Sequence, residues 1–207
     1  MRPVLRFVAS VMMVSGVLLI GDAGVTLAWQ EPISGYLAQR QQNELEEDLA
    51  DPDLQARVEA AFRERQRPLK GDAIGRIVLP AIDEDYYVIE GTDTESLRKG
   101  PGHYPETPLP GQRGTVGIAG HRTTHGAPFR EIDELERGDE VQVEMPYGTY
   151  VYRVERTRIV KPTDVWVKQR VGYDRLILSA CHPLYSAKER IVVFARYARR
   201  ERVRVSG

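Results

Sequence analysis

A single cysteine, Cys181, is the residue with the most distinctive chemistry in this sequence of 207 residues. One thiol excludes an intramolecular disulfide and a cysteine-based zinc cage, because each needs at least two thiols. Cys181 is therefore either a packed core residue or a reactive thiol. A reactive thiol acts as its thiolate, which needs a base or a cation nearby. Other parts of the chain must supply those partners.

Arg190 is the cation that the local pattern places beside Cys181. Residues 176–181 form an apolar, strand-like run that ends at the thiol. Pro183 ends the strand pairing soon afterwards, because proline has no backbone donor. Arg190 opens the next apolar run, residues 191–197. If the two runs pair antiparallel, the end of one lies beside the start of the other, so Cys181 and Arg190 become neighbours.

His121 is the favoured base among the four histidines. His182 is adjacent to Cys181 in the chain, and in a strand its side chain points to the opposite face. His103 lies among glycines and prolines, where a histidine is typically a structural or surface residue. His121 follows an apolar strand and Gly120, so small neighbours leave its ring accessible at a second strand end.

A structural interpretation of the same residues stays open. A lone cysteine after an apolar strand is often inert core, and an arginine is often a surface charge. The combination of an exported chain, a lone thiol, a glycine-flanked histidine and a nearby arginine favours a nucleophilic site.

The chain after Gly71 has the texture of a mostly β domain, with short apolar segments separated by glycine and proline. This spacing predicts a barrel or a sandwich. Short helical turns are expected over residues 94–99 and 129–135. The expected strands are residues 75–80, 86–90, 115–119, 140–145, 150–160, 176–181 and 191–197.

The segment before this domain, residues 35–66, is rich in Gln, Glu, Ala, Leu and Arg. Asp51 and Pro52 predict a break and a restart within it, with Asp51 as a cap and Pro52 in the first helical turn. Two polar helices and a semi-flexible stalk are both compatible with this composition.

The first thirty residues predict export. Arg2 and Arg6 precede an apolar stretch, residues 7–29, that is long enough to span a membrane if Asp22 lies near the outer interface. The arginines would then lie on the cytoplasmic side. A cleavable signal peptide that ends at Ala28 is the alternative. Either one places the β domain outside the cytoplasm.

Charge and motif content exclude other classes of function. The formal net charge of -1 gives no electrostatic case for a nucleic-acid partner. The single cysteine excludes a Cys-x-x-Cys motif, and neither a metal nor a cofactor is expected.

Several motifs together resemble the sortase family, most closely the class E enzymes of actinobacteria. The resemblance runs from about residue 75 to residue 197. The matching segments are Gly100-Pro-Gly-His-Tyr-Pro105, Pro110-Gly111, Ile118-Ala-Gly-His-Arg-Thr-Thr124, Gly126-Ala-Pro-Phe129, Leu135 with Gly138-Asp139, and Leu178-Ser-Ala-Cys-His-Pro183 with Ser186 and Glu189-Arg190.

The resemblance implies a closed eight-stranded β-barrel with short helices, preceded by an N-terminal transmembrane helix and a helical or flexible linker. The family's catalytic residues match His121, Cys181 and Arg190. The implied domains are a membrane anchor (1–30), an extracytoplasmic linker (31–72), a catalytic domain (73–200) and a basic tail (201–207).

The implied reaction is cleavage of a Leu-Pro-x-Thr-Gly or Leu-Ala-x-Thr-Gly sorting motif between Thr and Gly, followed by transfer of the acyl group to an amine. Surface proteins that carry the sorting signal are the expected substrates. A peptidoglycan precursor or crossbridge is the expected amine. The implied location is the cell membrane, with a single span.

The resemblance also implies substrate-binding roles for Thr124, His125, Ser179 and Ala180. The chain departs from the family pattern in two places. Ser179 and Ala180 stand where a threonine pair is usual, and His125 stands where many class E sequences carry tyrosine. These departures affect the expected substrate preference, not the reaction type.

Two rival functions remain. A hydrolytic cysteine endopeptidase would use the same residues on the same motif, with water as the acceptor. A non-catalytic surface subunit should carry its own sorting motif, an apolar segment and a basic tail. Residues 199–207 are basic but show neither the motif nor the apolar segment, which disfavours that role.

Overall fold

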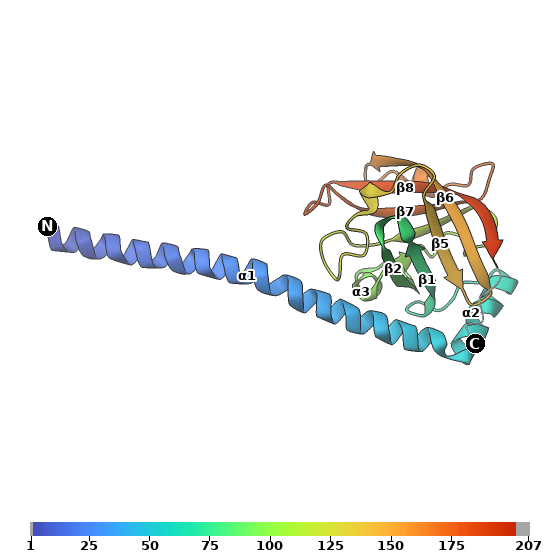
Figure 1. Cartoon of the computed structure of the whole chain (residues 1–207), viewed down its shortest axis with the longest axis horizontal. Coiled ribbons are helices and arrows are strands. Elements are labelled where there is room, and N and C mark those ends of the chain that lie inside the picture. Colours follow the sequence, from blue (N-terminus) through green and yellow to red (C-terminus); the bar gives the residue numbers. More distant parts are fainter. Residues whose placement is uncertain (1, 202–207) are drawn as a thin grey trace.

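A long helix and a β-barrel make up the protein (Figure 1). The structure is a computed structural model that describes residues 2–201. Within the first helix, side chains are described for residues 6–8, 10–21 and 35 onward. The predicted tail beyond residue 201 lies outside the described residues. The predicted anchor lies partly outside those with described side chains.

The first helix, α1 (Arg2–Ala50), is continuous and is followed directly by α2 (Pro52–Glu64). Asp51 separates them as the predicted cap: its Oδ1 accepts a hydrogen bond from the backbone N–H of Asp53 at 2.9 Å. Pro52 occupies the first turn, where no backbone donor is needed. The predicted break and restart are therefore present, and both segments beside the break are helical. No helix in the described part of the chain has a stretch long and apolar enough to cross a membrane.

Eight strands close into the barrel, in the order β1-β2-β3-β4-β7-β8-β6-β5. The pairs β2/β3 and β4/β7 are parallel, and the others are antiparallel. The strands are β1 (Ala73–Leu79), β2 (Glu84–Glu90), β3 (Gly102–His103), β4 (Thr115–Ala119), β5 (Glu140–Met145), β6 (Gly148–Val160), β7 (Arg175–His182) and β8 (Glu189–Glu201). Short helices in the connections are η1 (Pro80–Ile82), α3 (Thr94–Lys99), η2 (Ile132–Glu134) and η3 (Val165–Lys168).

The closed eight-stranded barrel with short helices confirms the predicted fold. All seven expected strands are present, and both expected helical turns occur, as α3 and η2. The sequence missed β3, because two residues are too short to show a period-2 pattern.

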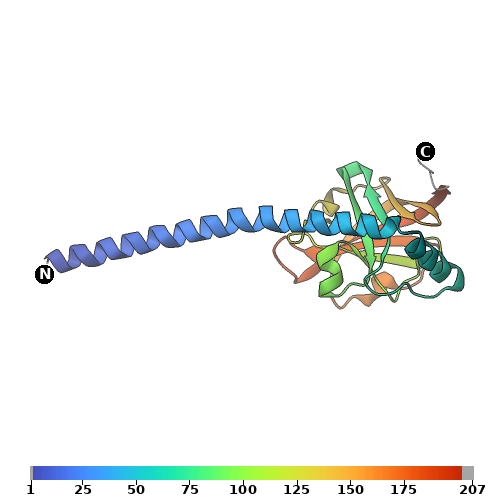
Figure 2. The same cartoon turned by 90° about the horizontal axis from the view of Figure 1, so that it is seen from below.

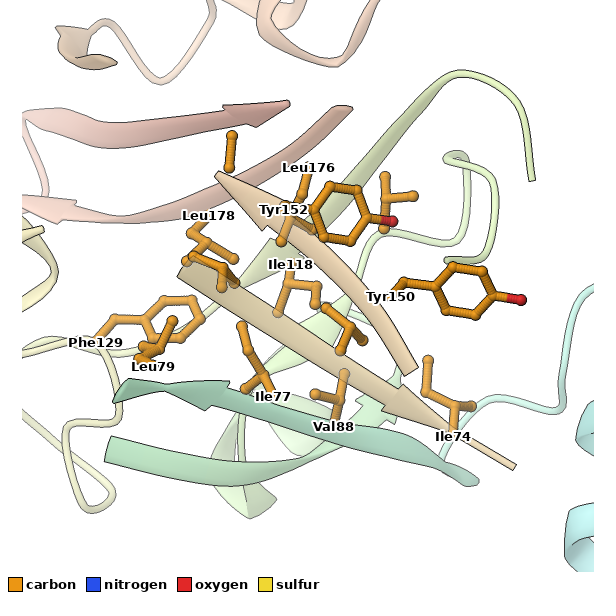
Figure 3. Packing of buried hydrophobic residues seen from close by; sticks show 14 of the residues in the cluster. Ile74, Ile77, Leu79, Val88, Ile118, Phe129, Tyr150, Tyr152, Leu176 and Leu178 are labelled. Carbon is orange, nitrogen blue, oxygen red and sulfur yellow. The ribbon is translucent and has the colours of Figure 1, made fainter. Parts of the chain in front are cut away.

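The barrel core is a single cluster of apolar side chains, part of which Figure 3 shows. On β7, Leu176, Leu178 and Ala180 belong to this cluster. Ile177 points the other way, into a second cluster beneath η3 that also contains Val192 of β8. Both faces of β7 are therefore buried over residues 176–178, which explains its continuous apolar run.

The end of α1 and the start of α2 lie against the barrel (Figure 2). Leu45 of α1 and Leu54 and Val58 of α2 are buried in the same cluster as the barrel interior. Elements outside the predicted catalytic domain therefore complete its core.

Candidate active site

Cys181 and Arg190 are directly paired across the β7/β8 ladder. Residues opposite each other on neighbouring strands project to the same face, so both side chains lie on the outer face of the barrel, on the side of Ile177 and Val192. Both side chains are partly exposed. The guanidinium Nη1 of Arg190 donates to the carbonyl oxygens of Ala187 at 3.0 Å and Glu189 at 2.9 Å. The β7–β8 loop thus holds the cation beside the thiol.

The parallel pairing of β4 and β7 brings His121 to the same edge. Ala119 is opposite Ser179, and the backbone N–H of Gly120 donates to the carbonyl oxygen of Ser179 at 3.0 Å. His121 lies two residues beyond Ala119, and Cys181 lies two residues beyond Ser179. Because parallel strands end at one edge, the imidazole and the thiol arrive at the same level.

A contact one residue further along joins the chain after β4 to the end of β7. Arg122 is 2% exposed, and its Nη1 lies 3.4 Å from His182 Nδ1. Its Nη2 donates to Asp133 at 2.5 Å and to the carbonyl oxygen of Arg130 at 2.8 Å. Since successive residues of a strand alternate faces, Cys181 projects to the side of β7 opposite His182. His182 is therefore directed away from the thiol, as the sequence predicted.

His121 is half-buried, and its electrostatics suit proton exchange. Burial, reinforced by the nearby charge of His125, lowers the pKa of His121 below its ordinary value. Its Nε2 is buried and has no hydrogen-bond partner in the described structure. At neutral pH the ring is neutral and has a nitrogen free for a proton.

His125 lies beside His121, with the ring centroids 4.9 Å apart and the planes inclined by 31°. Burial, followed by the positive charge of Arg98, lowers the pKa of His125. Its Nδ1 is also buried without a partner among the described residues. Two imidazole nitrogens without partners among the described residues therefore lie in one short loop, which starts next to the end of β7.

Comparison with known proteins shows the family of this chain. The sortase domain family model matches residues 77–198. The chain belongs to the sortase family. Sortase D of Bacillus subtilis is 32% identical over 146 residues, which cover 69% of this chain and 70% of that protein. Sortase SrtE1 of Streptomyces coelicolor is 28% identical, over 98% of this chain and 59% of the relative's length. The solved structure of sortase E from Streptomyces avermitilis superposes with a TM-score of 0.61 at 32% identity, covering 67% of this chain and 96% of that one.

Sortases are cysteine transpeptidases, so this chain is an enzyme of that class. Its similarity to the class E members agrees with the resemblance seen in the sequence. Among the residues that the structure describes, no group of three or more His, Cys, Asp or Glu side chains is placed to hold a metal ion.

The predicted substrate-binding residues of this sortase divide into two groups. Ser179 shares the outer face with Cys181, and its hydroxyl lies 2.9 Å from that of Tyr104. His125 and the exposed Thr124 lie in the loop after His121. Ala180 instead packs in the barrel core, so the structure does not bring its methyl group to the side of the thiol.

Tyr104 is an outer-face residue that the sequence did not single out. A Cβ at Gly117 would lie 2.7 Å from the Tyr104 ring, so the ring rests on β4 where a glycine leaves room. Lys168 of η3 lies 4.8 Å from the centre of that ring and forms an ion pair with Glu106. The β3–β4 and β6–β7 connections thus meet on the outer face.

Arg175 holds the β6–β7 connection, residues 161–174, against the barrel. Its Nη2 donates to the carbonyl oxygens of Val167 at 2.9 Å and Gln169 at 3.0 Å. Its Nε donates to Thr115 Oγ1 at 3.0 Å. A buried arginine at the start of a strand looks like a surface charge in the sequence, so only the non-local contacts reveal its role.

Proposed function

We propose that this sortase cleaves a Leu-Pro-x-Thr-Gly or Leu-Ala-x-Thr-Gly motif between Thr and Gly and transfers the acyl group to a cell-wall amine. The proposal is supported by the pairing of Cys181 with Arg190 across β7 and β8, together with the β4/β7 pairing, which ends two residues before His121. A thiol, a fixed cation and a neutral imidazole are the groups that acyl transfer through a thioester needs.

Cys181 is the nucleophile in the first half of the reaction. His121, neutral because burial lowers its pKa, accepts the thiol proton as the sulfur attacks the threonine carbonyl. The C–S bond forms, and the carbonyl oxygen becomes an oxyanion that Arg190 stabilises by charge-assisted hydrogen bonds. The C–N bond then breaks, and His121 gives its proton to the departing glycine amine.

The second half returns the enzyme to its starting state. An acceptor amine attacks the thioester, and the oxyanion forms again beside Arg190. His121 takes the amine proton and returns it to the sulfur as the C–S bond breaks. The new amide links the surface protein to its acceptor. Water in place of the amine gives hydrolysis by the same residues.

Incubation with a sorting peptide tests this function. Wild-type protein should form a covalent thioacyl adduct detectable by mass spectrometry, and Cys181→Ala should form none while keeping its thermal unfolding transition. Added amine should convert the product from the free acid to the amide. Turnover by Cys181→Ala would remove the nucleophile from this position.

We propose that the start of α1 anchors the enzyme in the membrane with the barrel on the outer side. Two arginines precede the apolar stretch, and Phe7, Met13 and Ile20 are largely exposed on the helix. An apolar surface of this extent needs a cover, and lipid supplies one. Retention of the full chain in carbonate-washed membranes supports the anchor. A mature N-terminus just after Ala28 would instead establish a cleaved signal peptide.

A further inference from the structure

Gln42 fixes α1 to the barrel through backbone groups of other elements. Its side chain is 9% exposed. Its Oε1 accepts from the Tyr87 backbone N–H at 2.7 Å, and its Nε2 donates to the carbonyl oxygens of Lys99 at 2.9 Å and Tyr87 at 3.3 Å. Only an amide can accept and donate in this pattern. A Cβ at Gly100 would lie 2.3 Å from Nε2, so the glycine makes room for the contact.

The helix face that carries Gln42 also reaches the loop after His121. Ala38 lies one turn earlier on the same face and is 8% exposed. A Cβ at Gly126 would lie 2.9 Å from the Ala38 methyl carbon, so loop and helix are in close contact. Leu45 continues this face into the barrel core.

The loop that rests on Ala38 has an unusual backbone. Its residues His125, Gly126 and Ala127 have φ values of 54°, 75° and 46°, all in the left-handed region. Non-glycine residues adopt that region at a cost and keep it where the surroundings enforce it. The helix surface at Ala38 is one such constraint.

Contacts continue from this loop to His121. The His125 ring lies 4.9 Å from the His121 ring. The positive charge of Arg98 in α3 also acts on His125 and lowers its pKa, and α1 contacts α3 as well. Helix α1 therefore contacts both the loop that carries His125 and helix α3, which carries Arg98.

We propose that the docked part of α1, residues 38–49, is a positioning element for His121, with Gln42 fixing the helix and Ala38 supporting the loop. This rests on the proposed function in that His121 is taken as the acid/base. Because α1 runs on towards the N-terminus, the state of that helix is coupled to the reactivity of the site.

Gln42→Glu is the sharpest perturbation, because it keeps the shape and places a carboxylate oxygen opposite two carbonyl oxygens. Gln41→Glu is the matched control, since it makes the same charge change at a partly exposed neighbour. Both are compared with wild type as full-length protein. Hydrogen exchange is followed in residues 38–49, 120–131 and β7–β8, and peptide cleavage gives kcat and KM.

Gln42→Glu should accelerate exchange in residues 38–49 and in 120–131 by about fivefold or more, and leave β7–β8 protected. Its kcat should fall about tenfold or more, because displacement of an acid/base by about 1 Å is enough for losses of this size. KM should change less than kcat, and Gln41→Glu should behave as wild type. Release of residues 38–49 with wild-type exchange in 120–131, or with wild-type kcat, overturns the proposal.

Ala38→Leu tests the same coupling between α1 and the loop and leaves the hydrogen bonds of Gln42 in place. It therefore decides whether the coupling exists if Gln42→Glu loosens the whole barrel. It should accelerate exchange in 120–131 and lower kcat, whereas Gln39→Leu at an exposed position should do neither. Equal behaviour of the two leucine variants refutes the role of Ala38. If wild type cleaves no sorting peptide, the proposed function fails, while loop exchange still decides whether α1 holds the loop.

Discussion

Arg175→Lys tests whether the β6–β7 connection is held by one buried guanidinium. Arg175 is 3% exposed and donates to two carbonyl oxygens and one hydroxyl. An ammonium has no planar fork and cannot reach all three acceptors together. Val167 loses its donor, whereas the Gln169 carbonyl oxygen keeps the Thr115 hydroxyl at 2.8 Å.

The expected loss of stability follows from that difference. A buried acceptor left without a partner costs about 1–3 kcal/mol, and here one carbonyl is left fully unpaired and another only in part. We expect Arg175→Lys to lower the free energy of unfolding by about 2 kcal/mol in urea titrations followed by circular dichroism. Arg158→Lys, at an exposed position of β6, should change it by less than about 0.5 kcal/mol.

The same variant separates the role of the β6–β7 connection from that of the reacting residues. The β6–β7 connection flanks the outer face that carries Cys181, so its release should raise KM for a sorting peptide. Cys181 and Arg190 are untouched, so kcat should change less. Unfolding energies of Arg175→Lys and Arg158→Lys that agree within error, or an unchanged KM, would refute the assigned role of Arg175.

Three further perturbations probe the site itself. Arg190→Lys should lower kcat by about a hundredfold, because the ammonium lacks the fork that supports the oxyanion, and near-normal thioacyl formation would reduce Arg190 to a structural charge. The lowered pKa of His121 means that the unfolded chain binds more protons than the folded chain at mildly acid pH. The contribution of His121 to stability is therefore complete above about pH 6.5 and is lost as the pH falls below that value. His121→Gln should flatten the fall of Tm between about pH 6.5 and 5, and an unchanged slope would contradict this. Gly117→Ala should cost about 1–3 kcal/mol in urea unfolding because its Cβ would lie 2.7 Å from the Tyr104 ring, and wild-type stability would show that the ring moves freely.

Local pairing explains which parts of the site were predictable from the sequence. Cys181 and Arg190 belong to consecutive strands, so a strand, a loop and a strand were enough to make them neighbours. His121 was predicted from its position after an apolar run, but the parallel β4/β7 pairing that brings it near the thiol joins distant parts of the chain. Barrel closure and the two-residue β3 likewise depend on contacts that periodicity does not encode.

Side-chain direction and burial were the harder part. Ala180 was expected to bind substrate, yet the alternation of side chains along β7 directs its methyl group into the barrel core. Arg122 and Arg175 are both nearly inaccessible, although arginines in a sequence usually indicate surface. Their carbonyl partners come from loops whose paths follow from the whole fold, so no pattern in the sequence indicated either role.

The register of β7 determines which chemistry the barrel edge can perform. A shift by one residue would exchange the faces of Cys181 and His182 and leave an imidazole where the thiol now lies beside Arg190. The contact between the buried Arg122 and His182 on the opposite side resists that shift, because the guanidinium would lose its imidazole partner. The residues that do not react therefore fix the side on which the reactive ones appear. In each of two adjacent pairs, Cys181 with His182 and His121 with Arg122, the first residue is assigned to the reaction. The second residue makes the contact that aligns the two chain segments.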